Sequence, residues 1–161
     1  KNALPPVLFV ARSVLASTMI HAPLLLALAL LYGPLHQFRP AVAALLPLLA
    51  LQLALCLLWG YALAILAAAL RDTVQLVGFV LSVGIFLSPV LFPITMFPQD
   101  WRWVLWLNPM TPWVTAYQSV LLQGAWPLMQ NWLLALMWVA LGALFLEVLL
   151  RRSRDQLVDW L

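Results

Sequence analysis

The sequence predicts an all-α integral membrane protein. It has four transmembrane helices, with two short re-entrant external helices between the last two spans. Hydrophobic residues make up 66% of the 161-residue chain and charged residues only 8%, whereas a soluble domain carries about 25% charged residues. Four apolar segments are also long enough to cross a bilayer, which takes about 20 residues. A water-soluble fold is therefore excluded.

Short polar or breaker-rich connections separate the four spans, which together form one transmembrane domain. We expect the spans at about 13–32, 41–70, 73–96 and 131–150. Pro23 interrupts the first span, and the second is longer than one crossing, so it can tilt or extend past the bilayer. Only Arg71 and Asp72 separate the second span from the third, which predicts a tight antiparallel hairpin.

Basic residues are divided unequally between the two sides of this topology. If the N-terminus is cytoplasmic, the outer side holds Arg39 and Arg102, and the inner side holds Lys1, Arg12, Arg71, Arg151, Arg152 and Arg154. This bias follows the positive-inside rule, so both ends of the chain are expected in the cytoplasm. The net charge of +3 then reflects topology and not nucleic-acid binding. Residues 151–161 are predicted to form an amphipathic tail at the inner surface.

The region at 97–124 is not a typical solvated loop, because it has few charges and many proline and tryptophan residues. Asp100 is placed to cap a short helix. Asn108-Pro109 would end that helix, since the residue before proline avoids the helical region. A second short helix fits 112–122, with Gly124 as its C-cap. We expect a re-entrant gate here, with a flat interfacial loop as the alternative.

The third span contains breakers of its own near its outer end. A proline frees a backbone carbonyl, and within a membrane that carbonyl must find a partner or water. A plain kink is one interpretation, but the kink combined with re-entrant helices predicts a movable external closure. The candidate gate residues are Ser88, Pro89, Pro93, Trp106, Asn108 and Pro109.

Aromatic residues are candidates for a substrate pathway. Phe79, Phe86 and Phe92 lie approximately on one stripe of the third span, and aromatic rings can contact sugar faces without a fixed hydrogen-bond pattern. Packing against a neighbouring helix explains the stripe equally well, and interfacial tryptophans occur in any membrane protein. The candidate pathway residues are Phe79, Phe86, Phe92, Trp113 and Tyr117.

No catalytic or metal-binding motif is present, so we expect no enzymatic site, metal or cofactor on this chain. Cys56 lies in an apolar run and is interpreted as a small buried hydrophobe. His21 is ionisable and lies within a span, which makes it a functional candidate. A neutral histidine bonded to Ser17 or to a neighbouring helix is the favoured alternative. Glu147 and Arg151 have the spacing of a helical ion pair.

Several short motifs follow one another along the chain from residue 71 onward. They are Arg71-Asp72, Ser88-Pro89-Val90-Leu91-Phe92, Asn108-Pro109, Ala116-Tyr117, Leu121-Leu122-Gln123-Gly124 and Pro127. Their order resembles that of the ABC-2 type transporter permeases, and within them the branch that exports O-antigen, capsule or teichoic acid. On this resemblance the chain is the C-terminal part of a six-helix permease. Many relatives carry Arg at the position of Gln118, so the charge of the substrate stays open.

The resemblance implies the permease subunit of an exporter in the plasma or inner membrane that moves lipid-linked polysaccharide outward. It also implies a homodimer, contact with membrane lipids, and a separate cytoplasmic ATPase that binds ATP and Mg. Arg71 and Asp72 would then face the cytoplasmic entrance or the ATPase, with a solvated turn as the alternative. A drug or lipid exporter and a membrane enzyme of envelope glycan synthesis are the competing functions.

Overall fold

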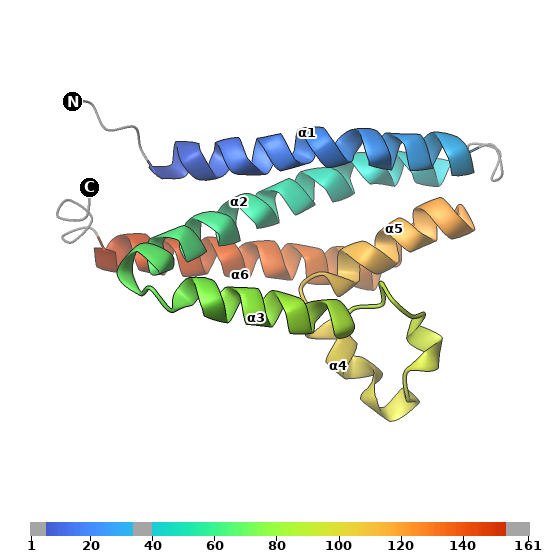
Figure 1. The fold of residues 1–161 in the computed structure, drawn as a ribbon. Coiled ribbons are helices and arrows are strands. Elements are labelled where there is room, and N and C mark those ends of the chain that lie inside the picture. The colour runs from blue at the N-terminus through green and yellow to red at the C-terminus, as the bar shows by residue number, and fades with distance from the viewer. Residues whose placement is uncertain (1–5, 34–39, 154–161) are drawn as a thin grey trace.

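The computed structural model describes residues 6–33 and 40–153. These residues form only helices and connections, which confirms the predicted all-α class (Figure 1). The elements are α1 (Pro6–Tyr32), η2 (Pro40–Ala44), α2 (Leu45–Ala69), α3 (Thr73–Phe86), η3 (Ile94–Met96), η4 (Gln99–Trp101), α4 (Arg102–Trp106), α5 (Thr111–Gln123) and α6 (Met129–Ser153). Arg39, Arg154 and most of the expected amphipathic tail lie outside the described residues.

Within residues 6–33 and 40–153, three helical segments are long and apolar enough to cross a membrane. They cover Val7–Tyr32, Pro40–Ala69 and Met129–Arg152. α1 begins several residues before the expected span and continues through Pro23 without ending. Large apolar side chains are exposed along these helices, as expected where lipid replaces water around a bundle.

The third span is shorter than the segment expected at 73–96. α3 has 14 residues and ends at Phe86, which corresponds to about 21 Å of helix against a hydrocarbon core of about 30 Å. Pro89 and Pro93 have no backbone N–H to continue the helical ladder. The chain instead turns after Phe86 and continues through η3 and η4 into α4.

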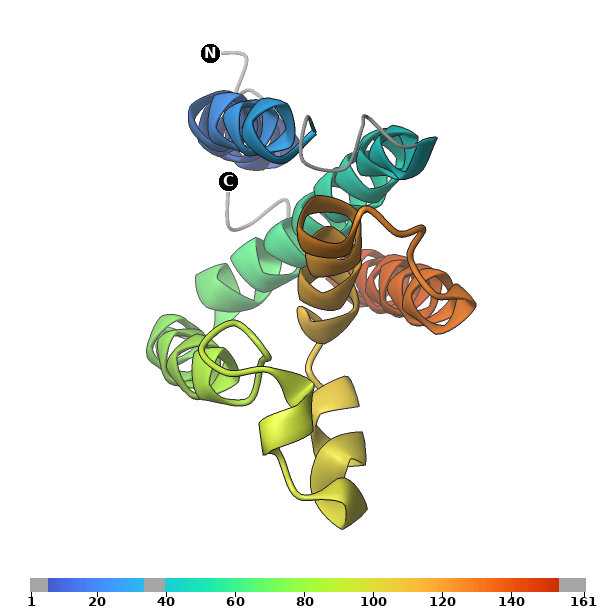
Figure 2. The same ribbon diagram turned by 90° about the vertical axis from the view of Figure 1, so that its right-hand side faces the viewer.

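The core of the bundle is the packing of α2 against α6, with α5 lying on both (Figure 2). Leu55, Trp113 and Ala135 form a buried cluster from these three helices. Trp59 of α2 lies against Gly142 of α6, and its Nε1 donates a hydrogen bond to the Trp138 carbonyl at 3.1 Å. A Cβ at position 142 would lie 2.6 Å from the Trp59 Nε1, so a larger residue there requires the indole to move.

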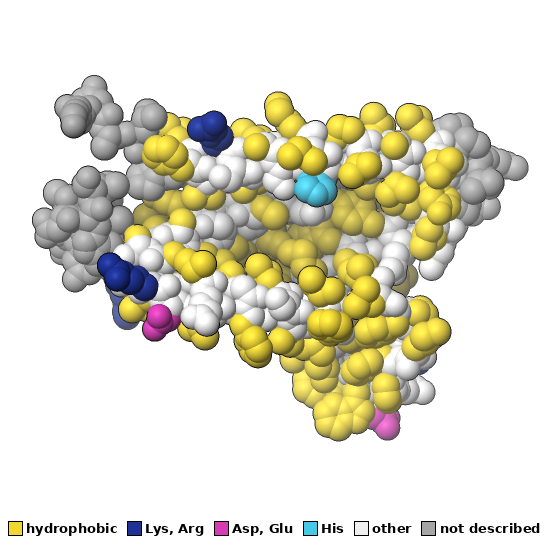
Figure 3. Space-filling view, viewed as in Figure 1, with side chains coloured by type: hydrophobic (Ala, Val, Ile, Leu, Met, Phe, Trp, Pro, Cys, Tyr) yellow, Lys and Arg dark blue, Asp and Glu magenta, His cyan; other side chains and the backbone are white. Residues whose placement is uncertain are grey.

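α1 and α3 are the peripheral helices of the molecule. They lie on either side of α2 in the end-on view of Figure 2, and α3 is exposed over nearly its whole length. Charged side chains gather at the two ends of the molecule and leave an apolar band between them (Figure 3). The α2–α3 turn, the start of α1 and the end of α6 lie at one end of the bundle, and α4 and α5 lie toward the other (Figure 1).

Candidate functional site

The candidate gate is built around the break that follows α3. The amide of Ser88 donates to the Ile85 carbonyl at 3.3 Å, so the Gly84 carbonyl loses its normal partner four residues further on. Pro93 has no N–H to offer to the Pro89 carbonyl, which lies four residues before it. The break therefore leaves two backbone acceptors, on Gly84 and Pro89, that need donors from elsewhere.

Each of these two acceptors receives a hydrogen bond from an amide side chain of the segment at 97–124. Asn108 Nδ2 donates to the Gly84 carbonyl at 2.6 Å. Gln118 Nε2, on α5, donates to the Pro89 carbonyl at 2.8 Å. We refer to these two contacts as the amide clamp. The clamp links the end of α3 to the segment that contains α4 and α5.

Asn108 also organises the turn between α4 and α5. Its Oδ1 accepts a hydrogen bond from the Met110 amide at 2.9 Å. The Thr111 hydroxyl donates to the Leu105 carbonyl, and both of these residues are fully buried. The sequence predicted that Asn108-Pro109 ends the first short helix, but it did not show that the Asn108 amide reaches α3.

The first short helix starts differently from the prediction. Asp100 lies within η4, its side chain makes no capping hydrogen bond, and α4 begins at Arg102. The N-cap positions of η4 and α4 are Pro98 and Trp101, so the capping prediction is wrong. Arg102 instead holds the preceding turn, because its guanidinium donates to the carbonyls of Phe97 and Thr95 at 3.1 and 3.2 Å. The second short helix ends at Gly124, in the left-handed region at φ 59°.

The predicted gate residues lie close to the amide clamp, with different exposures. Ser88 is 2% exposed, and its buried hydroxyl has no hydrogen-bond partner among the described residues. Pro89 is fully buried, whereas Pro93 is exposed. The half-buried members of the set are Trp106, Asn108 and Pro109.

The structure separates the predicted pathway aromatics into two groups. Phe79 and Phe86 are each 68% exposed on α3, and Phe92 is stacked on Phe97 with ring centres 6.1 Å apart. Trp113 is only 2% exposed and donates from its Nε1 to the Leu48 carbonyl at 3.3 Å. Trp113 therefore lies in the core that positions α5.

Tyr117 belongs to a separate groove formed by α1, α2 and α5. The groove is half open, has a volume of about 560 Å³ and is lined by Ser13, Val14, Ser17, Thr18, His21, Ala22, Leu25, Leu49, Gln52, Leu53, Cys56 and Tyr117. The Tyr117 hydroxyl donates to Gln52 Oε1 at 2.6 Å. His21 Nδ1 lies 2.7 Å from the Ser17 carbonyl, as the favoured interpretation of His21 expected.

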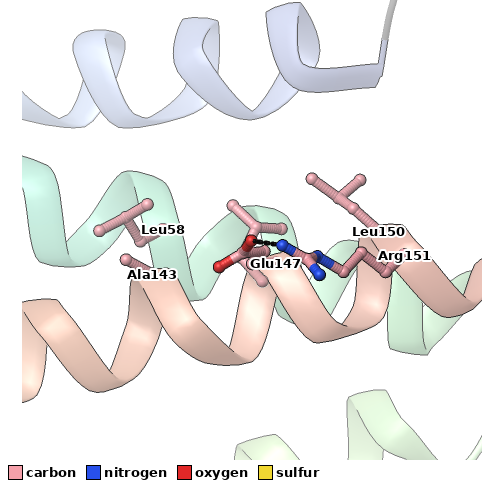
Figure 4. Close-up of a pocket in the computed structure, with 6 residues that line it drawn as sticks. Leu58, Ala143, Glu147, Leu150 and Arg151 are labelled. Atoms are coloured by element: carbon pink, nitrogen blue, oxygen red, sulfur yellow. Dashed lines mark hydrogen bonds and ion pairs between the residues drawn. The ribbon is translucent and has the colours of Figure 1, made fainter.

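The opposite end of the molecule contains the α2–α3 turn and a shallow depression. Arg71 and Asp72 are both exposed in the turn. Asp72 occupies the N-cap position of α3 without making a capping hydrogen bond, so the possible cap is absent. The depression has a volume of about 600 Å³ between α2 and α6, and Glu147 and Arg151 form an ion pair in it (Figure 4). This pair is exposed and contributes little stability.

Metal ligation has no support in the part of the chain that is described. Residues 6–33 and 40–153 contain no group of three or more His, Cys, Asp or Glu side chains that could hold a metal ion.

Comparison with known proteins identifies the family. Neither the curated proteins nor the solved structures include a significant match to this chain. The protein-family model described as ABC-2 type transporter matches residues 2–122, which are 121 of the 161 residues. The matched region contains α1, α2, α3, the amide clamp and nearly all of α5. The chain therefore belongs to the ABC-2 type transporter family, as a multi-pass membrane component of a transport system.

Proposed function

We propose that this chain is part of the permease of an ATP-driven exporter that moves lipid-linked polysaccharide outward across the plasma or inner membrane. Two permease copies form the pathway, and each engages a cytoplasmic ATPase that binds ATP and Mg. The observation that carries the proposal is the amide clamp, in which two side chains hold irregular backbone beside a shortened span. Such backbone persists at membrane depth only where protein or a water-filled cavity surrounds it.

The clamp is suited to a gate because few polar contacts fix the external segment to α3. Asn108 and Gln118 each contribute one hydrogen bond to α3 or to the turn after it, and one such bond is worth about 1 kcal/mol net. The re-entrant segment is anchored at its other end by α5, through the buried Trp113 and Ala116. Opening can therefore separate α3 from α4 without unfolding the α2–α5–α6 core.

The exposed aromatic stripe of α3 supports the pathway assignment. The Phe79 and Phe86 side chains are largely exposed within this chain, so a second permease copy or the cargo can cover them. Aromatic faces bind sugar rings by weak, repeated contacts, which permit a long polymer to slide. In this proposal Phe92 continues the pathway toward the external side, and Trp113 supports it from the core. Tyr117 lies instead in the separate groove between α1, α2 and α5.

The end of the bundle that contains the α2–α3 turn is proposed as the cytoplasmic side. Arg12, Arg71, Arg151 and Arg152 mark this end, as the positive-inside rule requires. The exposed Arg71 and Asp72 are then available to the ATPase or the cytoplasmic entrance. The depression beside Glu147 lies at the same end, between α2 and α6.

A disulfide across the clamp tests the gate. A Cβ placed on Gly84 lies 3.7 Å from Asn108 Nδ2, so side chains at these two positions face each other. A disulfide needs its two Cβ atoms about 3.5–4.5 Å apart, so its formation is measured before export is assayed. In a Cys56→Ala background, Gly84→Cys with Asn108→Cys should stop polysaccharide export under oxidation. Reductant should restore export, because the bond holds the two sides of the proposed opening together.

The two single-cysteine variants are the matched controls, and the oxidant should not change polysaccharide export by either of them. Full export by the cross-linked double variant, with the disulfide verified by mass spectrometry, would show that α3 and α4 do not separate during transport. Co-purification of the ATPase with the cross-linked permease verifies that assembly survives.

The cargo is tested by deleting the gene. Loss of a polysaccharide exporter leaves completed lipid-linked glycan inside the cell. Unextended precursors would instead indicate the enzyme of envelope glycan synthesis, and an unchanged glycan pool would favour a drug or lipid exporter. A neighbouring gene that encodes Walker A and B motifs would supply the expected ATPase.

A further inference from the structure

The groove between α1, α2 and α5 combines membrane depth with polar side chains. Ser13, Ser17 and His21 are spaced four residues apart and so share one face of α1. His21 lies about 12 Å along the helix axis from residue 13, at about 1.5 Å per residue. Gln52 and Tyr117 face the groove from α2 and α5. Polar groups at such a depth are costly unless they have hydrogen-bond partners.

The hydrogen bonds already present leave both donors and acceptors available. His21 Nδ1 must carry a proton to bond the Ser17 carbonyl, so Nε2 of the neutral ring is an acceptor. Gln52 Oε1 accepts from the Tyr117 hydroxyl, and its NH₂ group remains a donor. The hydroxyls of Ser13 and Ser17 have no hydrogen bond to any described residue and can serve in either role.

The groove contains no formal charge among its twelve lining residues, which include no Lys, Arg, Asp or Glu. A phosphate or carboxylate presents only acceptors and would need charged or numerous donors. A sugar hydroxyl both donates and accepts, which matches this mixed set. Leu25, Leu49 and Leu53 supply an apolar wall in the same groove, along which a hydrocarbon chain can lie.

We propose that this groove binds the uncharged sugar headgroup of a glycolipid, with its hydrocarbon chain against the leucines. The inference rests on the proposed function and deepens it, since it gives the lipid-linked cargo an intramembrane site within one permease copy. It also names the recognition chemistry as neutral hydrogen bonding. His21 and Ser17 of α1, with Gln52 of α2, are the specificity-determining residues.

Photolabelling of the full permease–ATPase complex in phosphatidylcholine vesicles tests the site. The two probes are diazirine analogues of monoglucosyl diacylglycerol and of phosphatidylglycerol with identical acyl chains. Mass spectrometry should find the neutral probe on α1 and α2 peptides several times more often than the anionic probe. Excess glucose in the buffer should not reduce labelling by the neutral probe. A reduction would overturn the inference that the bound sugar belongs to a lipid.

The test variants replace His21 and Ser17, whose side chains are exposed in the groove. His21→Leu and Ser17→Ala should each reduce neutral-probe labelling about fivefold, the effect of losing one hydrogen bond of about 1 kcal/mol. Neither side chain is buried, so both variants should fold. Ser82→Ala is the matched control, because the Ser82 hydroxyl is exposed on α3 and bonds only its own helix. It should label like the unmodified protein.

The outcomes separate this inference from the proposed function. Equal or greater labelling by the anionic probe overturns the inference, and so does an absence of groove labelling because another protein segment fills the groove. Retained intracellular polysaccharide in the deletion strain would still support export in those cases. Conversely, selective labelling with no change in cellular polysaccharide would keep the glycolipid site and reject polysaccharide as the cargo.

Discussion

At the scale of single residues, the main feature is how the freed carbonyls of Gly84 and Pro89 are satisfied. Water is not available in the hydrocarbon core, so a broken span must obtain donors from the protein itself. Asn108 and Gln118 supply them from two different positions of the segment at 97–124. An amide suits this role because it donates without introducing a charge.

Replacing Gln118 tests the clamp directly. Gln118→Leu keeps the volume approximately but leaves the Pro89 carbonyl unpaired, which costs about 1–3 kcal/mol. The midpoint of thermal unfolding of the full permease in detergent should therefore fall. Gln75→Leu is the control, because Gln75 is exposed on α3. An equal fall in both variants would show that the leucine itself, and not the lost hydrogen bond, lowers the midpoint.

At the scale of helices, the packing of α2 on α6 depends on a notch at Gly142. Gly142→Ala would place a Cβ 2.6 Å from Trp59 Nε1 and 2.8 Å from its Cδ1. The indole must move, which strains its bond to the Trp138 carbonyl, and such overpacking costs about 1–3 kcal/mol. The thermal unfolding midpoint should fall.

Gly78→Ala is the matched control for this prediction. A Cβ at Gly78 meets nothing within 4 Å, and alanine is favoured over glycine inside a helix by about 1 kcal/mol. The midpoint of this variant should stay or rise. A rise in both variants would mean that the Trp59 indole moves aside without cost and that the notch does not fix the register of α2 and α6.

The helices could be predicted from sequence because apolar length and proline position determine them locally. α5 and its end at Gly124 followed from a first-turn proline and a glycine C-cap. The clamp could not be predicted, since Asn108 lies 24 residues from Gly84 and Gln118 lies 29 from Pro89. The signal available in the sequence was Gln118, an amide side chain within the predicted second short helix. The burial of Trp113 also could not be predicted, because it depends on tertiary packing and not on the local sequence.

At the scale of the whole molecule, the two ends of the bundle differ in both backbone and charge. One end has the tight α2–α3 turn together with Arg12, Arg71, Arg151 and Arg152, and the other has the irregular segment with Arg102 as its basic residue in the described part of the chain. The apolar band between them is visible in Figure 3. This polarity is the structural basis for assigning the cytoplasmic side, because cytoplasmic connections carry the excess of Lys and Arg.

Labelling with a membrane-impermeant maleimide tests this assignment. Single cysteines are introduced as Asp100→Cys or Asp72→Cys in a Cys56→Ala background, and both sites are exposed in the structure. With the reagent outside intact cells or spheroplasts, Asp100→Cys should react and Asp72→Cys should not. Permeabilisation should then make both react, which controls for the intrinsic reactivity of each thiol. The reverse pattern would place the α2–α3 turn outside, and it would remove the ATPase-facing role of Arg71 and Asp72 together with the external position of the gate.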